Sequence, residues 1–99
     1  MIRQVTWFRF KREVETARRE EFIDRLRRLV GASEAARDPK IGTNLHEVED
    51  AYHVTVMADF QGRDDMEAYN DHYENEPVAD LAKALCADVS GGNYELVAD

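Results

Sequence analysis

The beginning of the chain has large apolar side chains at both alternating positions of a β-strand. For the segment Ile2–Phe10, one face would carry Ile2, Gln4, Thr6, Phe8 and Phe10, and the other Arg3, Val5, Trp7 and Arg9. This pattern is typical of a central strand in a sheet that is covered on both faces. Helices of the same chain can cover one face. In so short a chain a second subunit is the natural cover for the other, so the pattern favours a homodimer.

A helix is expected next, because apolar residues recur at helical spacing from Glu15 or Thr16 to Val30. The buried stripe of this helix would consist of Phe22, Leu26, Leu29 and Val30. Gly31 is predicted to be the C-cap, since glycine often ends a helix in the left-handed conformation. The connection that follows has room for one helical turn at Ser33–Ala36.

The rest of the chain alternates between strand and helix patterns. A strand is expected at about Lys40–His46, and a second strand at Tyr52–Phe60. A helical stretch from Gln61 to Tyr69 follows, and then a second helical segment that begins near Pro77 and buries Val78, Leu81, Ala82 and Leu85. A last strand is expected between Ala87 and Val97. Alternation in the strand Tyr52–Phe60 puts Tyr52 on the same face as Val54. Ser90-Gly91-Gly92 predicts a bulge or a loose start in the last strand. The order β-α-β-β-α-β predicts an α+β, ferredoxin-like fold in which the first and third strands are central.

Composition narrows the class of protein. Hydrophobic residues make up 43% and charged residues 34% of the 99 residues, as expected for one soluble globular domain over residues 1–99. No apolar run reaches the roughly 20 residues of a membrane span, and the chain runs into its first strand without a signal-peptide pattern. The single cysteine, Cys86, excludes an internal disulfide framework and favours a cytoplasmic location. The net charge of −8 makes nucleic acid and anionic membranes poor partners.

Several short stretches occur in a characteristic order. They are the opening Ile-Arg-Gln-Val-Thr-Trp-Phe-Arg-Phe-Lys, then Ile41-Gly42-Thr43-Asn44, then Phe60 with Ala68-Tyr69 and His72, and finally Asn93-Tyr94-Glu95. In this order and spacing they resemble the stress-responsive dimeric A/B-barrel (Dabb) family over about Ile2 to Leu96. The resemblance implies a homodimer in which the sheets of two subunits close into a barrel.

The resemblance also implies positions for a site. Polyketide-cyclase members of the family, of which the olivetolic acid cyclases of plants are the best-known kind, use a His-Pro-x-His stretch. Its first His falls on His72, its Pro on Tyr73, and its second, proton-handling His on Asn75. A tyrosine three positions before the first His falls on Tyr69, and a His often present in the first strand falls on Gln4.

The candidate pocket therefore combines two parts of the chain. It consists of Gln4, Thr6 and Phe8 on the first strand with Tyr69, His72 and Asn75 from the segment above it. A mostly apolar cavity with a few polar groups is typical of a small-molecule site, although the same residues could simply fill a core.

Two functions remain open on this basis. One is a Dabb-like homodimer, without an assigned activity, that binds a small apolar or aromatic molecule. The other is a cyclase, isomerase or lyase in which His72 and Tyr69 are the catalytic residues. Glutamine and asparagine cannot exchange protons near neutral pH, so Asn75 in place of a histidine favours the binding function.

Three other features have structural interpretations. His46 and His53 flank the acidic turn at residues 47–50, but their spacing matches no recognised metal motif, so a solvated turn is expected there. The sequence contains no Cys/His cluster, glycine-rich phosphate loop or dinucleotide fingerprint, so neither a metal nor another cofactor is expected. Cys86 is interpreted as a small buried hydrophobe rather than a nucleophile. Trp7 is interpreted as an anchor of the dimer interface rather than part of a cofactor cleft.

Overall fold

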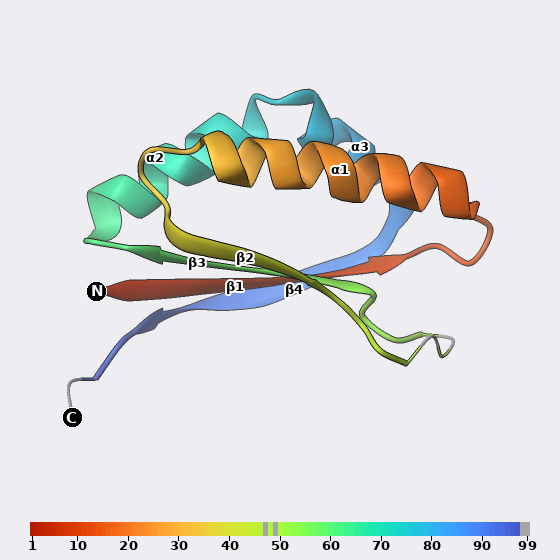
Figure 1. The fold of residues 1–99 in the computed structure, drawn as a ribbon, viewed down its shortest axis with the longest axis horizontal. Coiled ribbons are helices and arrows are strands. Elements are labelled where there is room, and N and C mark those ends of the chain that lie inside the picture. The colour runs from red at the N-terminus through yellow and green to blue at the C-terminus, as the bar shows by residue number, and fades with distance from the viewer. Residues whose placement is uncertain (47, 49, 98–99) are drawn as a thin grey trace.

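The computed structural model describes residues 1–46, 48 and 50–97, in which three helices cover one face of a four-stranded antiparallel sheet (Figure 1). The elements are β1 (Ile2–Phe10), α1 (Thr16–Ala32), β2 (Arg37–Thr43), β3 (Val54–Phe60), α2 (Arg63–Glu74), α3 (Pro77–Leu85) and β4 (Cys86–Glu95). The strand order β2-β3-β1-β4 confirms the ferredoxin-like α+β fold, with β1 and β3 at the centre. Among the described residues, no helix is long and apolar enough to cross a membrane.

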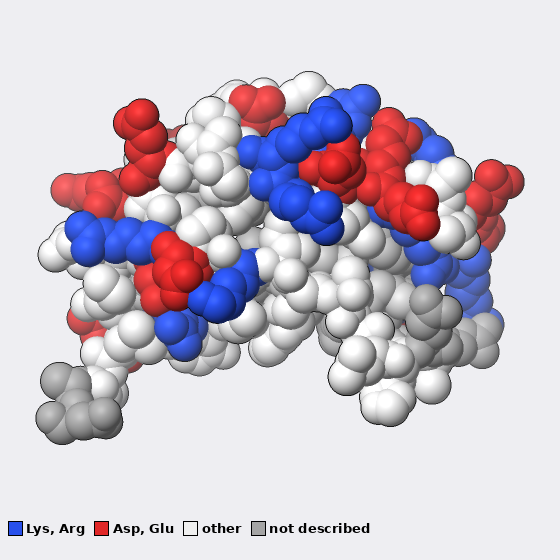
Figure 2. Space-filling model, viewed as in Figure 1, with Lys and Arg blue, Asp and Glu red and all other residues white. Residues whose placement is uncertain are grey.

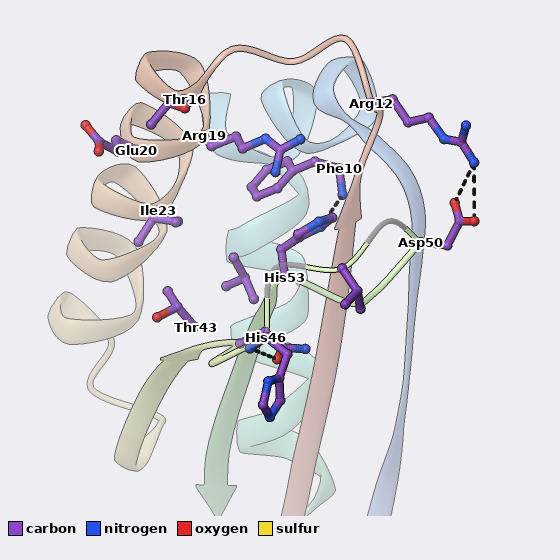
Figure 3. A pocket seen from close by; sticks show the side chains of 13 residues that line it. Phe10, Arg12, Thr16, Arg19, Glu20, Ile23, Thr43, His46, Asp50 and His53 are labelled. Carbon is purple, nitrogen blue, oxygen red and sulfur yellow. Dashed lines mark hydrogen bonds and ion pairs between the residues drawn. The ribbon is translucent and has the colours of Figure 1, made fainter.

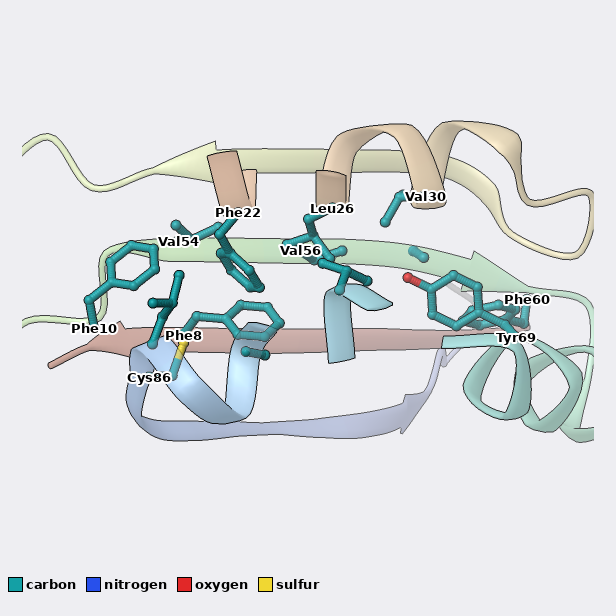
Figure 4. Packing of buried hydrophobic residues seen from close by; sticks show 14 residues of the cluster. Phe8, Phe10, Phe22, Leu26, Val30, Val54, Val56, Phe60, Tyr69 and Cys86 are labelled. Carbon is teal, nitrogen blue, oxygen red and sulfur yellow. The ribbon is translucent and has the colours of Figure 1, made fainter. Parts of the chain in front are cut away.

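The hydrophobic core lies between the helices and the side of the sheet that they cover, called the covered face below. Phe22 of α1 meets two residues of β1, its ring centroid lying 5.2 Å from that of Phe8 and 5.7 Å from that of Phe10 (Figure 4). Along β3, the residues that point to the helices are all buried, while those between them are half-buried. The predicted alternation of β1 and β3 therefore directs one set of their apolar side chains, which includes Phe8, Phe10 and Phe60, into one core.

The opposite side of the sheet, called the open face below, carries no helix in the part of the chain that the structure describes (Figure 1). It presents Arg3, Val5, Trp7 and Arg9 of β1 beside Thr55, Met57 and Asp59 of β3. Figure 2 shows the underside of the molecule hollowed between its two ends. Trp7 is 38% exposed there although it lies on a central strand. The chain by itself thus leaves a large aromatic residue of its central strand in water.

Helix α1 ends later than the sequence pattern predicts. Gly31 lies in its last turn, and the C-cap is Ser33, whose N–H donates to the carbonyl oxygen of Val30. The prediction of Gly31 as C-cap was wrong because Ser33 leaves the helix in an extended conformation (φ −74°, ψ 124°), which needs no glycine. The predicted helical turn at Ser33–Ala36 is a bend, and β2 follows from Arg37.

Strand β3 begins at Val54 rather than Tyr52. The ladder between β1 and β3 ends at the pair Phe8–Val54, so strand alternation does not extend beyond it. Tyr52 turns to the open face, where its ring centroid lies 6.2 Å from that of Trp7. The prediction that Tyr52 shares a face with Val54 was therefore wrong. Residues 47 and 49 of the predicted acidic turn lie outside the described residues.

The irregularity in β4 also lies elsewhere than predicted. Pairing between β1 and β4 continues from Ile2–Glu95 to Arg9–Asp88, through the glycines, and shifts only between Arg9 and Phe10. Gly91 has a φ of 152°, and a Cβ atom on it would overlap the carbonyl oxygen of Val5. Gly91 therefore serves the close approach of the two strands instead of breaking their pairing.

Candidate functional site

A cavity of about 220 Å³ lies between the covered face of the sheet and α2, and it is called the covered cavity below. Its apolar lining consists of Phe8, Leu26, Val56 and Val89. Its polar lining consists of Gln4, Thr6, Tyr69, Asn70, Tyr73 and Glu74. Four of the six residues predicted for the pocket, Gln4, Thr6, Phe8 and Tyr69, are thus brought together here.

Gln4 is the centre of a side-chain network beside this cavity. Its Nε2 atom donates to Oδ1 of Asn70 on α2 and to Oδ1 of Asn93 on β4, each at 3.0 Å. The network ties the central strand to the helix above it and to the edge strand beside it. Since both amide protons of Gln4 are used, its carbonyl oxygen is what remains for another partner.

Two tyrosines one helical turn apart line the same cavity from α2. Tyr69 is 7% exposed and its ring packs against Phe60, with 5.2 Å between the centroids. Figure 4 shows its hydroxyl end pointing toward the middle of the core. Burial raises the pKa of Tyr69 to about 12, and burial with the neighbouring Glu74 raises the pKa of Tyr73 to about 12. Both phenols therefore stay protonated, as hydrogen-bond donors, far above neutral pH.

The structure does not bring His72 and Asn75 into the covered cavity. The His72 side chain is 60% exposed, with its Nε2 atom 2.9 Å from Oε1 of Glu76. Asn75 is exposed at the C-cap of α2, and its Nδ2 atom donates to the carbonyl oxygen of Asp71 at 2.7 Å. The reason is helical phase: at about 100° per residue, His72 is rotated about 60° and Asn75 about 120° from Tyr69.

Sequence reasoning assigned Leu26 and Val56 to apolar helix and strand patterns without placing them in the pocket, and it missed Asn70, Tyr73, Glu74 and Val89 as cavity residues. The signal for Tyr73 was present, because it lies four positions after Tyr69 and such pairs share a helix face. The prediction ended this helix at Tyr69, whereas α2 continues to Glu74. Val89 could not be placed because the strand that carries it was expected to be irregular.

A family comparison bears on this site. The model of the stress responsive A/B barrel domain (Dabb) matches residues 2–95, from the first strand to the end of the last. The chain belongs to the Dabb family. This finding confirms the resemblance drawn from the ordered short stretches, and the ferredoxin-like fold of the chain agrees with it. No curated protein matches the chain.

Solved structures resemble this Dabb domain over nearly its whole length. A dimeric ferredoxin-like protein of unknown function from Thermobifida fusca is 26% identical, covers 96% of this chain and 90% of its own, and has a TM-score of 0.82. A hypothetical protein from Arabidopsis thaliana is 18% identical, with coverage of 99% and 89% and a TM-score of 0.78. The hydroxynitrile lyase from Passiflora edulis is 18% identical, with coverage of 94% and 90% and a TM-score of 0.71. The last two show the fold alone.

A larger cleft of about 660 Å³ opens at the other end of this Dabb domain, between the start of α1 and the β2–β3 connection (Figure 3). His46 and His53 both line it, but Figure 3 shows their rings pointing in different directions. Nδ1 of His53 accepts a hydrogen bond of 3.1 Å from the N–H of Phe10. Within the described part of the chain, no group of three or more His, Cys, Asp or Glu side chains could hold a metal ion.

The open face carries a third, shallower hollow of about 610 Å³ beside Trp7. Gly42 and Thr55 line it, and because Gly42 has no side chain, the surface of the sheet is depressed at this point. Polar groups flank the apolar centre of the face: Arg3 and Asp59 form an ion pair at 2.8 Å at one end, and Tyr52 hydrogen-bonds to Asp88 at the other. An apolar centre with a polar rim is the usual anatomy of a protein interface.

Cys86 packs against the core at the start of β4 and is 9% exposed. Burial raises the pKa of its thiol from 9.0 to about 11. At pH 8 the thiolate fraction in the folded protein is then about 100-fold lower than in an unfolded chain, and the thiolate is the reactive form. We expect an aromatic disulfide reagent to label the native protein at least about 100-fold more slowly than the protein in denaturant. Equal rates would contradict the interpretation of Cys86 as an inert core residue.

Proposed function

We propose that this Dabb domain is a homodimer that binds a small apolar or aromatic molecule in the covered cavity. The observation that carries the proposal is the composition of the cavity wall. Phe8, Leu26 and Val56 supply apolar surface, while the hydroxyls of Tyr69 and Tyr73 make no hydrogen bond with any described residue. Mostly apolar walls with a few uncommitted polar groups are characteristic of small-molecule sites.

The volume limits the size of the ligand. An apolar cavity of about 150 Å³ accommodates benzene, so about 220 Å³ fits a single ring with a small substituent. A drug-sized molecule would need a larger pocket. The proposed ligand class is therefore one-ring aromatic compounds and aliphatic compounds of similar size.

The cyclase alternative has less support. It needs a group that transfers a proton beside the ligand. His72, which the alternative would use for this, points away from the covered cavity and contacts Glu76. Tyr69, its other proposed catalytic residue, has a pKa of about 12 and gives up its proton poorly near neutral pH. These features favour binding without turnover.

Dimerisation is proposed through the open face. Val5 is half-buried and Trp7 exposed on a central strand, and a hollow lies beside Trp7. The relative from Thermobifida fusca is described as dimeric. A second copy packed against this face would remove Trp7 from water and satisfy the two-sided apolar pattern of β1.

Calorimetric titration of the protein with a panel of one-ring aromatic compounds tests the binding function. We expect saturable binding of at least one compound to the native protein, and its loss in Val89→Phe. Val89 lines the cavity but is 48% exposed, so a larger side chain there fills the cavity without crowding the sealed core. Val97→Phe is the matched control, because Val97 is 91% exposed and lies outside the lining.

A panel that shows no saturable binding would contradict the proposed function. Binding that persists unchanged in Val89→Phe would show that the ligand binds in another cavity. Rapid turnover of a bound compound that disappears in His72→Ala would replace the proposal with the cyclase alternative.

A further inference from the structure

Charge of only one sign, negative, occurs among the described side chains that line the covered cavity. Of the described residues that line it, none is Lys, Arg or His, and the one charged side chain is the carboxylate of Glu74. The remaining polar groups are neutral hydroxyls and amides. A carboxylate ligand would therefore enter a partly desolvated site without a counter-ion, which is costly, and the carboxylate of Glu74, although exposed and screened by solvent, adds a repulsion.

The neutral groups divide into donors and acceptors. The hydroxyls of Tyr69 and Tyr73 are free of partners among the described residues, and neither is sealed from solvent. They come from positions i and i+4 of α2, so they lie on the same side of the helix. The amide protons of Gln4 are already committed to Asn70 and Asn93. The uncommitted donors in the cavity therefore include the two phenols, and the hydroxyl of Thr6 and the Nδ2 group of Asn70 are further neutral donors in its lining.

A pair of neutral donors above an apolar wall matches a ligand with a neutral acceptor on an apolar body. We propose that the covered cavity selects uncharged molecules that combine one apolar ring with a carbonyl-type hydrogen-bond acceptor, and rejects the corresponding carboxylates. This selection rests on the proposed function, since it concerns the same cavity. Tyr73 and Glu74 are its specificity-determining residues: the phenol of Tyr73 donates to the acceptor, and the carboxylate of Glu74 repels anions.

The donors keep this role over a wide pH range. With a pKa of about 12, neither phenol loses its proton under physiological conditions. A neutral ketone would therefore bind with little pH dependence between about pH 6 and pH 9. A ligand recognised by a titrating group would show a change of affinity across this interval.

Three probes of similar size separate the contributions of the neutral acceptor, the apolar ring and a negative charge to the affinity. They are acetophenone, ethylbenzene and benzoate. At pH 7.5 we expect acetophenone to bind at least about 10-fold more tightly than benzoate, with ethylbenzene between them. In Tyr73→Phe, the ratio of acetophenone to ethylbenzene affinity should fall about 3- to 10-fold, the range for one neutral hydrogen bond. In Glu74→Gln, benzoate should bind more tightly while acetophenone changes little. Tyr94→Phe is the matched control, because Tyr94 is 52% exposed and does not line the cavity.

The outcomes distinguish the two proposals. Suppose that ethylbenzene binds the native protein but not Val89→Phe, and that benzoate and acetophenone bind with equal affinity. The proposed selection of uncharged ligands is then refuted, while the proposed binding function stands. An unchanged ratio in Tyr73→Phe would also overturn the selection. If none of the three probes binds, both proposals fail together.

Discussion

Trp7→Asp is expected to convert the protein from a dimer to a folded monomer. Wild type should have about twice the chain mass of 11.4 kDa in solution at micromolar concentration. The substitution places a charge without a partner in the centre of a surface that the proposed dimer desolvates. Central aromatic residues are frequent hot spots, so we expect the dissociation constant to rise at least about 100-fold, which corresponds to about 3 kcal/mol. Sedimentation equilibrium measures both the mass and the constant.

The chain should remain folded, because Trp7 is already 38% exposed in the single subunit. Far-ultraviolet circular dichroism checks this. Ala68→Asp is the matched control: it adds the same charge at an exposed position of α2, on the helical side of the molecule. A wild-type monomer, or a Trp7→Asp variant that stays fully dimeric, would contradict the assignment of the open face as the interface. A stable interface of this kind buries more than about 1,000 Å² in total.

Gly91→Ala is expected to destabilise the protein by about 3 kcal/mol, because it combines a backbone conformation unsuited to a side chain with a steric clash. Gly91 has a φ of 152°, and its Cβ would overlap the backbone of Val5 in the paired strand. Relief requires β4 to move away from β1, which breaks ladder hydrogen bonds of the central strand. Urea unfolding monitored by circular dichroism measures the loss.

Gly31→Ala is the control for this effect, since the same substitution should act in the opposite direction. A Cβ on Gly31 meets no atom within 4 Å, and the residue lies within α1. Replacing a helical glycine with alanine typically stabilises by about 0.5–1 kcal/mol. Gly91→Ala with wild-type stability would show that β4 moves away from β1 at little cost, and it would contradict the expected strain at this position.

The sequence pattern was sufficient for the faces of the two central strands. Alternation in β1 and β3 places large residues such as Phe8 and Phe60 on one face, and burial of that face drives the fold. The pattern was insufficient where the rule of alternation stops. Tyr52 follows a strand period in sequence but lies beyond the last residue pair of the ladder, so tertiary contact with Trp7 decides its direction.

The candidate site was predictable where it rests on the sheet and not where it depends on helix rotation. Gln4, Thr6 and Phe8 follow from strand parity alone. The direction of α2 depends on which of its residues packs against the sheet, and the buried Tyr69 settles this. Tyr73 then shares its side, while His72 does not. A resemblance that aligns positions along the chain carries no such information about phase.

A two-dimensional ¹H–¹⁵N NMR titration of the native protein with acetophenone tests most directly whether the ligand binds in the covered cavity. We expect saturable chemical-shift changes for amides around the covered cavity, at Thr6, Tyr69, Tyr73 and Val89. We expect no comparable change in the indole N–H of Trp7, because this side chain lies on the open face, where we propose that a second copy packs. Shifts centred on the open face, or on the cleft that His53 lines, would contradict the assignment of one face to the ligand and the other to the partner subunit.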